Sequence, residues 1–195
     1  MKNFFRILIK YIIFIYNKIV YRVKVVGKEN VPKDGAFIIC GNHRSYLDPP
    51  LMVTTCKRKV RFMAKQELKN NPITRLAVYI FDGIYVKRSS KDIGAMKEAL
   101  KTLNQGGGIA LFPEGTRNGI EKGVHIKNGV SYFALNSDAI IIPVGIKGDL
   151  KPFHKIIVTY GKPLDFSEYK SNKKDKEVIE NVTNIIMKNI IELSK

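Results

Sequence analysis

Residues 36–48 have the sequence AFIICGNHRSYLD, in which a short apolar run leads directly into polar and ionisable side chains, His43 and Asp48 among them. Two later segments repeat this arrangement: GIYVKR at 83–88 and IALFPEGTR at 109–117. In open α/β sheets, ligands bind outside the carboxyl ends of the strands. If the three apolar runs are neighbouring strands, we expect their polar ends to meet in one cleft.

Short runs of Ile, Val and Phe alternate with longer amphipathic stretches through the rest of the chain, which predicts strands alternating with helices. The predicted strands are 23–26, 36–40, 60–64, 84–86, 109–112, 140–144 and 156–160, and the predicted helices are 49–56, 73–81, 92–103, 130–136 and about 174–193. Such alternation is typical of an α/β fold in which helices flank a central, mostly parallel sheet.

The composition is that of a globular protein with a large excess of positive charge. The chain has 195 residues, of which 45% are hydrophobic, and its 34 Lys and Arg against 17 Asp and Glu give a net charge of +17. Disorder and fibrous repeats are excluded, while the charge indicates an anionic partner such as nucleic acid, phosphate esters, an acidic protein or a membrane. Two cysteines exclude a disulfide framework, and no pattern of Cys and His suggests a metal site.

Residues 1–28 hold seven basic side chains and no acidic one, around an apolar segment. Its longest uncharged run, 11–17, is much shorter than the ~20 residues of a membrane-spanning helix. On a helix, a polar stripe (Lys2, Arg6, Lys10, Asn17) opposes an apolar face (Phe4, Leu8, Tyr11, Ile12, Ile15, Ile19). We therefore expect residues 1–22 to form a helix at the cytoplasmic face of the cell membrane, peripheral or monotopic, followed by a domain at 23–195. A terminal helix packed on its own domain is the alternative.

His43 and Asp48 are five residues apart, so they meet only if the chain turns between them. A turn is plausible because Asp48 precedes Pro49 and Pro50, a typical helix start. A carboxylate that holds one imidazole nitrogen fixes the tautomer and makes the ring a general base. Neither Cys40 nor Ser45 has a motif typical of a covalent nucleophile. Alternatively, Asp48 caps a helix and His43 is a polar loop residue.

The segment 113–117 offers backbone amides, the Thr116 hydroxyl and the Arg117 guanidinium directly after a strand, and Arg88 adds a second guanidinium. Guanidinium groups bind phosphate through two parallel hydrogen bonds. This favours a phosphate site, although the same residues also suit an ordinary turn with solvated arginines.

These segments, taken in order, resemble the four motifs of the glycerolipid acyltransferases. The resemblance rests on Asn42-His43 with Asp48, on 83–88, on FPEGTR at 112–117 and on IPVGI at 142–146. The subgroup it indicates is the 1-acylglycerol-3-phosphate O-acyltransferases, and the implied fold is that of the glycerol-3-phosphate acyltransferases. Lys87 stands where an acidic or neutral residue often precedes the arginine.

The resemblance implies transfer of a fatty acyl group from an acyl carrier protein or coenzyme A thioester to the sn-2 hydroxyl of 1-acylglycerol 3-phosphate, giving phosphatidic acid. His43 would deprotonate the hydroxyl and Asp48 would orient His43. The residues implied in binding the acceptor phosphate are Arg88, Glu114, Gly115, Thr116 and Arg117, with Asn42, Lys87 and Pro143 in support. No metal or nucleotide cofactor is implied.

Other functions are compatible with parts of this pattern. Glycerol 3-phosphate or another lysolipid could be the acceptor. The chain could also be a non-catalytic basic protein at the membrane surface. Nucleic-acid binding is favoured by charge alone, because no helix-turn-helix, zinc finger or RNA-recognition motif is present.

Overall fold

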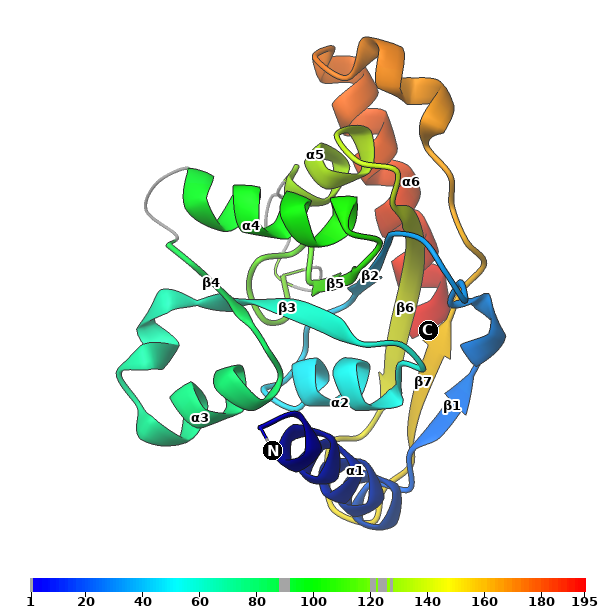
Figure 1. The fold of residues 1–195 in the computed structure, drawn as a ribbon. Coiled ribbons are helices and arrows are strands. Elements are labelled where there is room, and N and C mark those ends of the chain that lie inside the picture. The colour runs from blue at the N-terminus through cyan, green and yellow to red at the C-terminus, as the bar shows by residue number, and fades with distance from the viewer. Residues whose placement is uncertain (1, 88–91, 120–121, 123–125, 127) are drawn as a thin grey trace.

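The computed structural model describes residues 2–87, 92–119, 122, 126 and 128–195. A seven-stranded sheet lies between two layers of helices (Figure 1). The strands are β1 (Lys24–Val26), β2 (Phe37–Gly41), β3 (Val60–Lys65), β4 (Ile84–Val86), β5 (Gly108–Leu111), β6 (Ile140–Gly148) and β7 (Ile156–Tyr160). The α-helices are α1 (Lys2–Val20), α2 (Asp48–Thr55), α3 (Pro72–Ile80), α4 (Ile93–Asn104), α5 (Gly129–Leu135) and α6 (Lys176–Ser194), and short 3-10 helices lie at Lys28–Asn30, Gln66–Lys69 and Ser167–Asn172.

The strand order is β1-β7-β6-β2-β5-β3-β4, and only the β6–β7 pair is antiparallel among the paired strands. The chain leaves β2 toward β3 and later returns to place β5 and β6 on either side of β2. A cleft forms at such a reversal of direction, outside the carboxyl ends of the strands.

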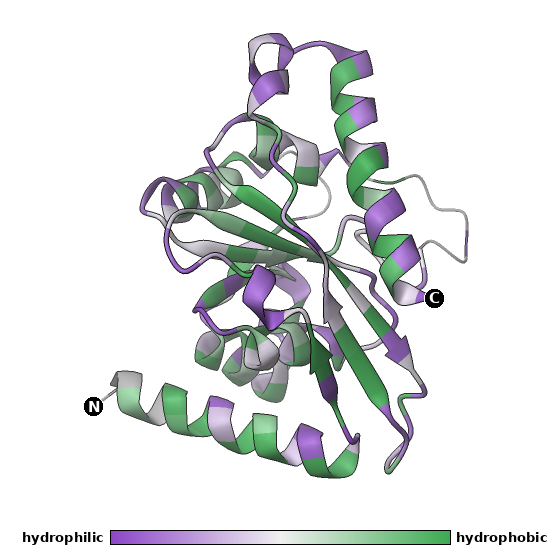
Figure 2. Ribbon diagram, turned by 90° about the vertical axis from the view of Figure 1, so that its right-hand side faces the viewer, coloured by the Kyte–Doolittle hydropathy of each residue, from purple (hydrophilic) through white to green (hydrophobic). Residues whose placement is uncertain are grey.

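Side chains alternate between the two faces of the sheet, which explains why the central strands β2 and β5 are apolar throughout. In β2, Phe37 and Ile39 pack in a core with α2 and α3, whereas Ile38 and Cys40 pack in a second core with α4, α5 and α6. The strands of the sheet are correspondingly hydrophobic along their length in Figure 2. Because both faces are covered, a run of Ile, Val and Phe is the pattern that such a buried sheet needs.

The helix α1 packs on α2 and α3 through only part of its circumference. Ile9 and Ile13 contact the core, and Asn17 is buried. Part of the polar stripe therefore lies against the domain, since Asn17 is on the packed side. Among the described residues, no helix is long and apolar enough to cross a membrane.

The predicted fold class, an α/β structure with helices on both faces of a mostly parallel sheet, is confirmed. Each predicted strand is present within about two residues, except that β6 continues to Gly148 instead of ending at Val144. The extension exists because β7 pairs with residues 144–148 in the antiparallel direction. This longer β6 places Ile146 and Lys147 beside the end of β2.

Candidate active site

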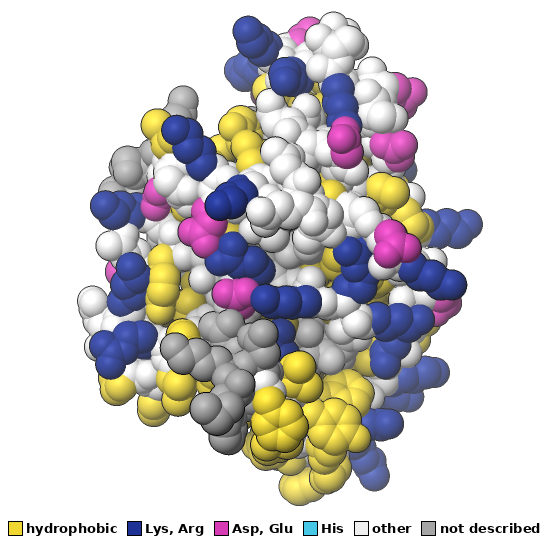
Figure 3. Space-filling view, viewed as in Figure 1, with side chains coloured by type: hydrophobic (Ala, Val, Ile, Leu, Met, Phe, Trp, Pro, Cys, Tyr) yellow, Lys and Arg dark blue, Asp and Glu magenta, His cyan; other side chains and the backbone are white. Residues whose placement is uncertain are grey.

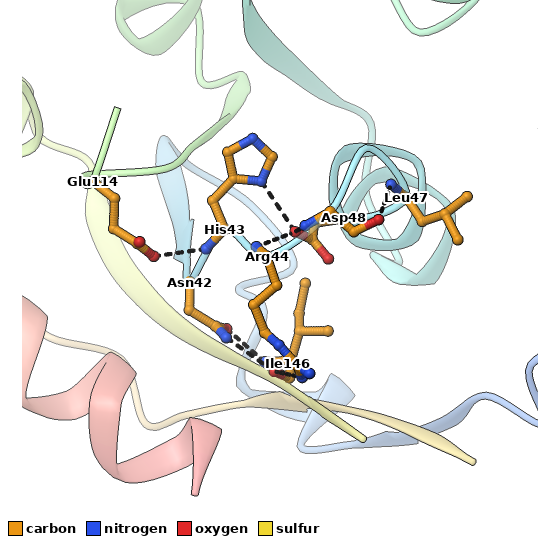
Figure 4. Close-up of polar contacts among 8 residues, drawn as sticks. Asn42, His43, Arg44, Leu47, Asp48, Glu114 and Ile146 are labelled. Carbon is orange, nitrogen blue, oxygen red and sulfur yellow. Dashed lines mark hydrogen bonds and ion pairs between the residues drawn. The ribbon is translucent and has the colours of Figure 1, made fainter. Parts of the chain in front are cut away.

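The end of β2 is joined to β6 by the Asn42 side chain. Asn42 Nδ2 donates to the Ile146 carbonyl at 2.9 Å, and the Ile146 N–H donates to Asn42 Oδ1 at 2.7 Å (Figure 4). The amide is buried, so both of its hydrogen-bonding functions are used inside the protein. Asn42 is thus a structural link that holds the chain just before His43.

His43 and Asp48 lie in direct contact. His43 Nδ1 is 3.0 Å from Asp48 Oδ2, and the Asp48 carboxylate is fully buried while the imidazole keeps some exposure. An ionised carboxylate only accepts hydrogen bonds, so the neutral ring carries its proton on Nδ1 and leaves Nε2 with a free lone pair. The structure therefore brings together the two residues that the sequence predicts to act as a pair.

Asp48 is the first residue of α2 and its side chain closes the turn before the helix. Its Oδ2 also accepts the backbone N–H groups of Arg44 and Ser45, each at 2.6 Å. Leu47 is the N-cap residue, and its side chain makes no capping hydrogen bond. Three donors therefore fix the carboxylate in front of the imidazole, and Asp48 does more than begin a helix.

The loop after β5 holds the His43 backbone from both sides. Glu114 Oε1 accepts the His43 N–H at 2.7 Å, and the Asn118 N–H donates to the His43 carbonyl at 2.6 Å. Glu114 is buried. The motif resemblance implies that Glu114 binds the acceptor phosphate, but a carboxylate repels phosphate, and here it accepts the His43 N–H. Its position is that of a residue that orients His43.

The imidazole also stacks on an aromatic ring and faces a cleft. It stacks on Phe112 with ring centroids 4.3 Å apart and an interplanar angle of 23°. The cleft has a volume of about 460 Å³, and its lining joins the loops after β2 and β5 to the end of β6 and the end of α6: Asn42, His43, Arg44, Glu114, Asn118, Lys147, Gly148, Ile191, Ser194 and Lys195. Its basic groups suit an anionic substrate beside the imidazole.

Arg117 is exposed and lies over the Tyr46 ring, with its guanidinium carbon 3.8 Å from the ring centroid. This cation–π contact connects the loop after β5 with the loop after β2. Gly115 and Thr116 form the turn between Glu114 and Arg117, and Gly115 has a φ of 60°. Gly115, Thr116 and Arg117 belong to the same loop as Glu114 but do not line the cleft.

The remaining predicted residues are more dispersed. β4 is separated from β5 by β3, so Lys87 lies at the edge of the sheet, where its N–H donates to Asp92 Oδ2 at 2.9 Å. That hydrogen bond lowers the pKa of the Asp92 carboxyl. Arg88 is outside the described residues. Pro143 is buried within β6 and does not line the cleft.

Among the described residues, the structure supports neither Cys40 as a nucleophile nor a metal site. Burial raises the pKa of the Cys40 thiol well above its ordinary value, so Cys40 is a poor nucleophile. Across the part of the chain that the structure describes, no group of three His, Cys, Asp or Glu residues could hold a metal ion. A larger cavity of about 620 Å³, lined by Arg58, Lys59, Arg61 and Asp82 among others, contains none of the motif residues.

Asn118, Lys147 and the end of α6 also line the cleft, although none of them belongs to the motif residues predicted from the sequence. Lys147 was missed because β6 was predicted to end earlier. A signal for α6 is Gly145, where an added Cβ would lie 2.2 Å from the Leu193 carbonyl oxygen. Glycine thus allows the last turn of α6 to lie directly on β6.

Comparison with known proteins shows which family the chain belongs to. The family model described as "Acyltransferase" matches residues 22–147, more than half of the chain, and this stretch contains every residue that lines the His43 cleft except Gly148 and the end of α6. The chain belongs to the acyltransferase family. Among its relatives, the 1-acyl-sn-glycerol-3-phosphate acyltransferase of Borreliella burgdorferi is 32% identical over 70% of this chain and 56% of its own length.

The enzyme of the same name from Bacillus subtilis is 28% identical over 88% of the present chain and 87% of its own length. The crystal structure of the 1-acyl-sn-glycerophosphate acyltransferase PlsC from Thermotoga maritima superposes with a TM-score of 0.71 at 26% identity, covering 99% of this chain and 83% of that one. The present chain spans only about half the length of several curated relatives that it matches.

Proposed function

We propose that the protein transfers a fatty acyl group from a thioester to the sn-2 hydroxyl of 1-acylglycerol 3-phosphate, giving phosphatidic acid. The observation that carries this proposal is the buried Asp48 carboxylate, which the backbone N–H groups of Arg44 and Ser45 hold against His43 Nδ1. The acceptor is inferred from the names of the relatives, which are 1-acyl-sn-glycerol-3-phosphate acyltransferases. This acceptor is a phosphate ester, which suits the basic lining of the cleft.

The reaction needs one base that returns its proton. His43 Nε2 takes the proton of the acceptor hydroxyl as the oxygen attacks the thioester carbonyl carbon, and Asp48 stabilises the imidazolium that forms. The tetrahedral intermediate then collapses: the C–S bond breaks, and the leaving thiolate takes the proton from Nε2. The products are an ester and a free thiol, with His43 restored and no covalent acyl-enzyme formed.

The neighbouring groups divide the remaining tasks. Glu114 and Phe112 hold the imidazole in position, one through the backbone and one through the ring. Arg44 and Lys147 line the cleft itself, and Arg117, in the same loop as Glu114, offers an exposed guanidinium that can bind the acceptor phosphate through paired hydrogen bonds. Positioning of this kind lowers the barrier because the hydroxyl and the base meet without further ordering.

We also propose that α1 attaches the enzyme to the membrane surface as a peripheral helix. The outer side of α1 exposes large apolar side chains, with Phe4, Ile7, Tyr11 and Ile19 each more than 60% accessible. Exposed Ile73 and Leu76 of the neighbouring α3 extend this surface. Figure 3 shows hydrophobic side chains gathered at this end of the molecule with Lys and Arg beside them, as expected of a helix lying in an anionic interface.

The activity is tested with the purified protein, a panel of acceptors and both donor types, with the lipids read by mass spectrometry. The proposal predicts phosphatidic acid from 1-acylglycerol 3-phosphate, with acyl carrier protein or coenzyme A released as free thiol. Product only from glycerol 3-phosphate would reassign the acceptor. No ester from any acceptor would favour a non-catalytic protein at the membrane surface.

The attachment is tested by flotation on vesicles of phosphatidylcholine and phosphatidylglycerol. Replacing Ile7 and Ile19 by serine removes two exposed apolar side chains, and we expect the bound fraction to fall severalfold. Ile93→Ser is the matched control, because Ile93 is equally exposed on α4, in the opposite helix layer. Equal loss in the control, or no loss in the double variant, would contradict an α1-specific interface.

A further inference from the structure

The hairpin between β6 and β7 carries an exposed aromatic side chain that the proposed function does not use. Phe153 is 69% accessible and stands in the turn at the tip of this hairpin. Its φ is 66°, a left-handed conformation that a bulky residue rarely adopts. Because such strain persists only where the surroundings enforce it, it often marks a functional position.

Backbone hydrogen bonds hold this tip against the end of α1. The Phe153 N–H donates to the Val20 carbonyl at 2.5 Å, and the Ile156 N–H donates to the Tyr21 carbonyl at 3.1 Å. In Figures 1 and 2, the hairpin and α1 lie together at the same end of the molecule. The tip that carries Phe153 is therefore held at the carboxyl end of α1, on a different segment of the chain.

The other end of the same hairpin forms part of the cleft. Lys147 and Gly148, which precede Phe153 by six and five residues, line the cleft together with His43. Gly148 has a φ of 107°, and an added Cβ would lie 2.1 Å from the Lys155 carbonyl oxygen, so only glycine closes the hairpin here. One short segment thus connects the cleft with the aromatic tip.

The charges of the hairpin match an anionic lipid surface. It contains the three lysines Lys147, Lys151 and Lys155 against the single acid Asp149, which is 3.5 Å from the Lys151 ammonium group. Lysines flanking an exposed aromatic side chain are typical of segments that lie at the headgroup level of a bilayer. A single protruding ring offers far less area than the ~800 Å² per partner that a stable protein interface buries.

We infer that Phe153 inserts into the interface of an anionic bilayer as a second lipid contact, separate from α1. This inference rests on the proposed function, since it presumes an enzyme that works at a membrane surface. Two contacts on different segments fix the orientation of the protein as well as its attachment. The hairpin then places the cleft beside the lipid surface from which an acceptor must come.

The chain has no tryptophan, so a single introduced indole reports its own surroundings. Three full-length variants are compared on phosphatidylcholine–phosphatidylglycerol vesicles with brominated acyl chains: Phe153→Trp, Tyr11→Trp on α1, and Tyr132→Trp on α5. Tyr132 is the control, because α5 lies at the opposite end of the molecule (Figure 1). Bromine quenches indole fluorescence only at short range, so quenching reports insertion.

We expect brominated lipid to quench at least half of the emission from Phe153→Trp and Tyr11→Trp and to leave Tyr132→Trp unchanged. Quenching at Tyr11 without quenching at Phe153 would overturn the hairpin contact and leave the α1 interface intact. If neither position is quenched, the membrane attachment and the hairpin contact both fail. Equal quenching at all three positions means non-specific adsorption, which also overturns the inference.

A second measurement asks whether the contact contributes to binding. Replacing Phe153 by serine should lower the vesicle partition coefficient by about tenfold, the effect of withdrawing one large apolar side chain from the lipid. Phe153→Leu should retain most of the binding, because it keeps an apolar tip. Equal partition of the serine and leucine variants would contradict insertion of the side chain.

Discussion

Two histidine–aspartate pairs in this chain have nearly the same local geometry and very different surroundings. In both pairs the partners are five residues apart, and Nδ1 lies close to Oδ2: 3.0 Å for His43–Asp48 and 3.2 Å for His154–Asp149. Asp48 is fully buried with His43 18% accessible, whereas Asp149 and His154 are 46% and 53% accessible.

The carboxylates also differ in what else they bind. Asp48 accepts two backbone N–H groups at 2.6 Å, while Asp149 has Lys151 at 3.5 Å as its other partner among the described contacts. An exposed pair of the second kind contributes at most about 1 kcal/mol and reorients freely. A general base therefore needs more than a carboxylate at the right distance. It needs a carboxylate that the fold itself holds in place.

Removing the imidazole gives the largest contrast between the two pairs. We expect His43→Ala to lower kcat by on the order of 10⁴-fold, because the acceptor hydroxyl loses its base. The matched His154→Ala should stay within about twofold of wild type, since an exposed surface pair carries little energy. Release of free thiol from the acyl thioester, with the acceptor in detergent micelles, measures both. Comparable losses in the two variants would remove the distinction between the pairs.

Replacing the two carboxylates tests the same contrast, with a slightly smaller expected change in kcat. Asp48→Asn should lower kcat by on the order of 10³-fold, because the amide no longer enforces the Nδ1–H tautomer. Asp149→Asn is the control and should change kcat by less than about twofold. Circular dichroism must show that both variants are folded. A folded Asp48→Asn enzyme with full turnover would mean that Asp48 merely begins α2.

Glu114 sharpens the comparison because nothing like it supports His154 among the described contacts. Glu114→Ala should lower kcat by about 30-fold and leave the KM for the acceptor nearly unchanged, since the Glu114 carboxylate accepts the His43 N–H and so positions the base. Steady-state kinetics with varied acceptor separates the two parameters. A rise in KM at constant kcat would instead restore the phosphate-binding role that the motif resemblance implies.

Arg117 gives the smallest effect and the opposite kinetic signature. Arg117→Ala should raise the acceptor KM by about tenfold with little change in kcat, because a charge-assisted contact to the phosphate is lost in the ground state and transition state alike. Lys97→Ala on α4 removes an exposed positive charge far from the site and serves as the control. An Arg117 variant indistinguishable from that control would exclude the phosphate contact.

The strands and helices could be predicted because a parallel sheet that is buried on both faces requires runs of Ile, Val and Phe such as 36–40, and these runs are visible in the sequence. It also predicted the His43–Asp48 pair, since Pro49 and Pro50 mark the helix start where the chain turns. The order of strands in the sheet has no such local record. For this reason β4, with Lys87, lies farther from β5 than the shared strand-end pattern suggested.

Contacts between distant segments explain the other differences. The role of Glu114 depends on a hydrogen bond to a residue 71 positions away, and Lys147 enters the site only because β7 extends β6. The helical pattern of α1 separates polar from apolar residues correctly but does not say which side faces the domain. Asn17 is buried there together with Ile9 and Ile13, which leaves the apolar face outward.

The most direct test of the account is the tautomer of His43. The chain has three histidines, so a long-range ¹H–¹⁵N spectrum of the histidine-labelled full-length protein in micelles, assigned with the His43 and His154 variants, resolves each ring. At a pH where the ring is neutral, the account predicts a single Nδ1–H tautomer for His43, with an unprotonated Nε2, and averaged tautomers for His154. A proton on Nε2 of neutral His43 would contradict it, because the nitrogen that faces the acceptor could not then act as the base.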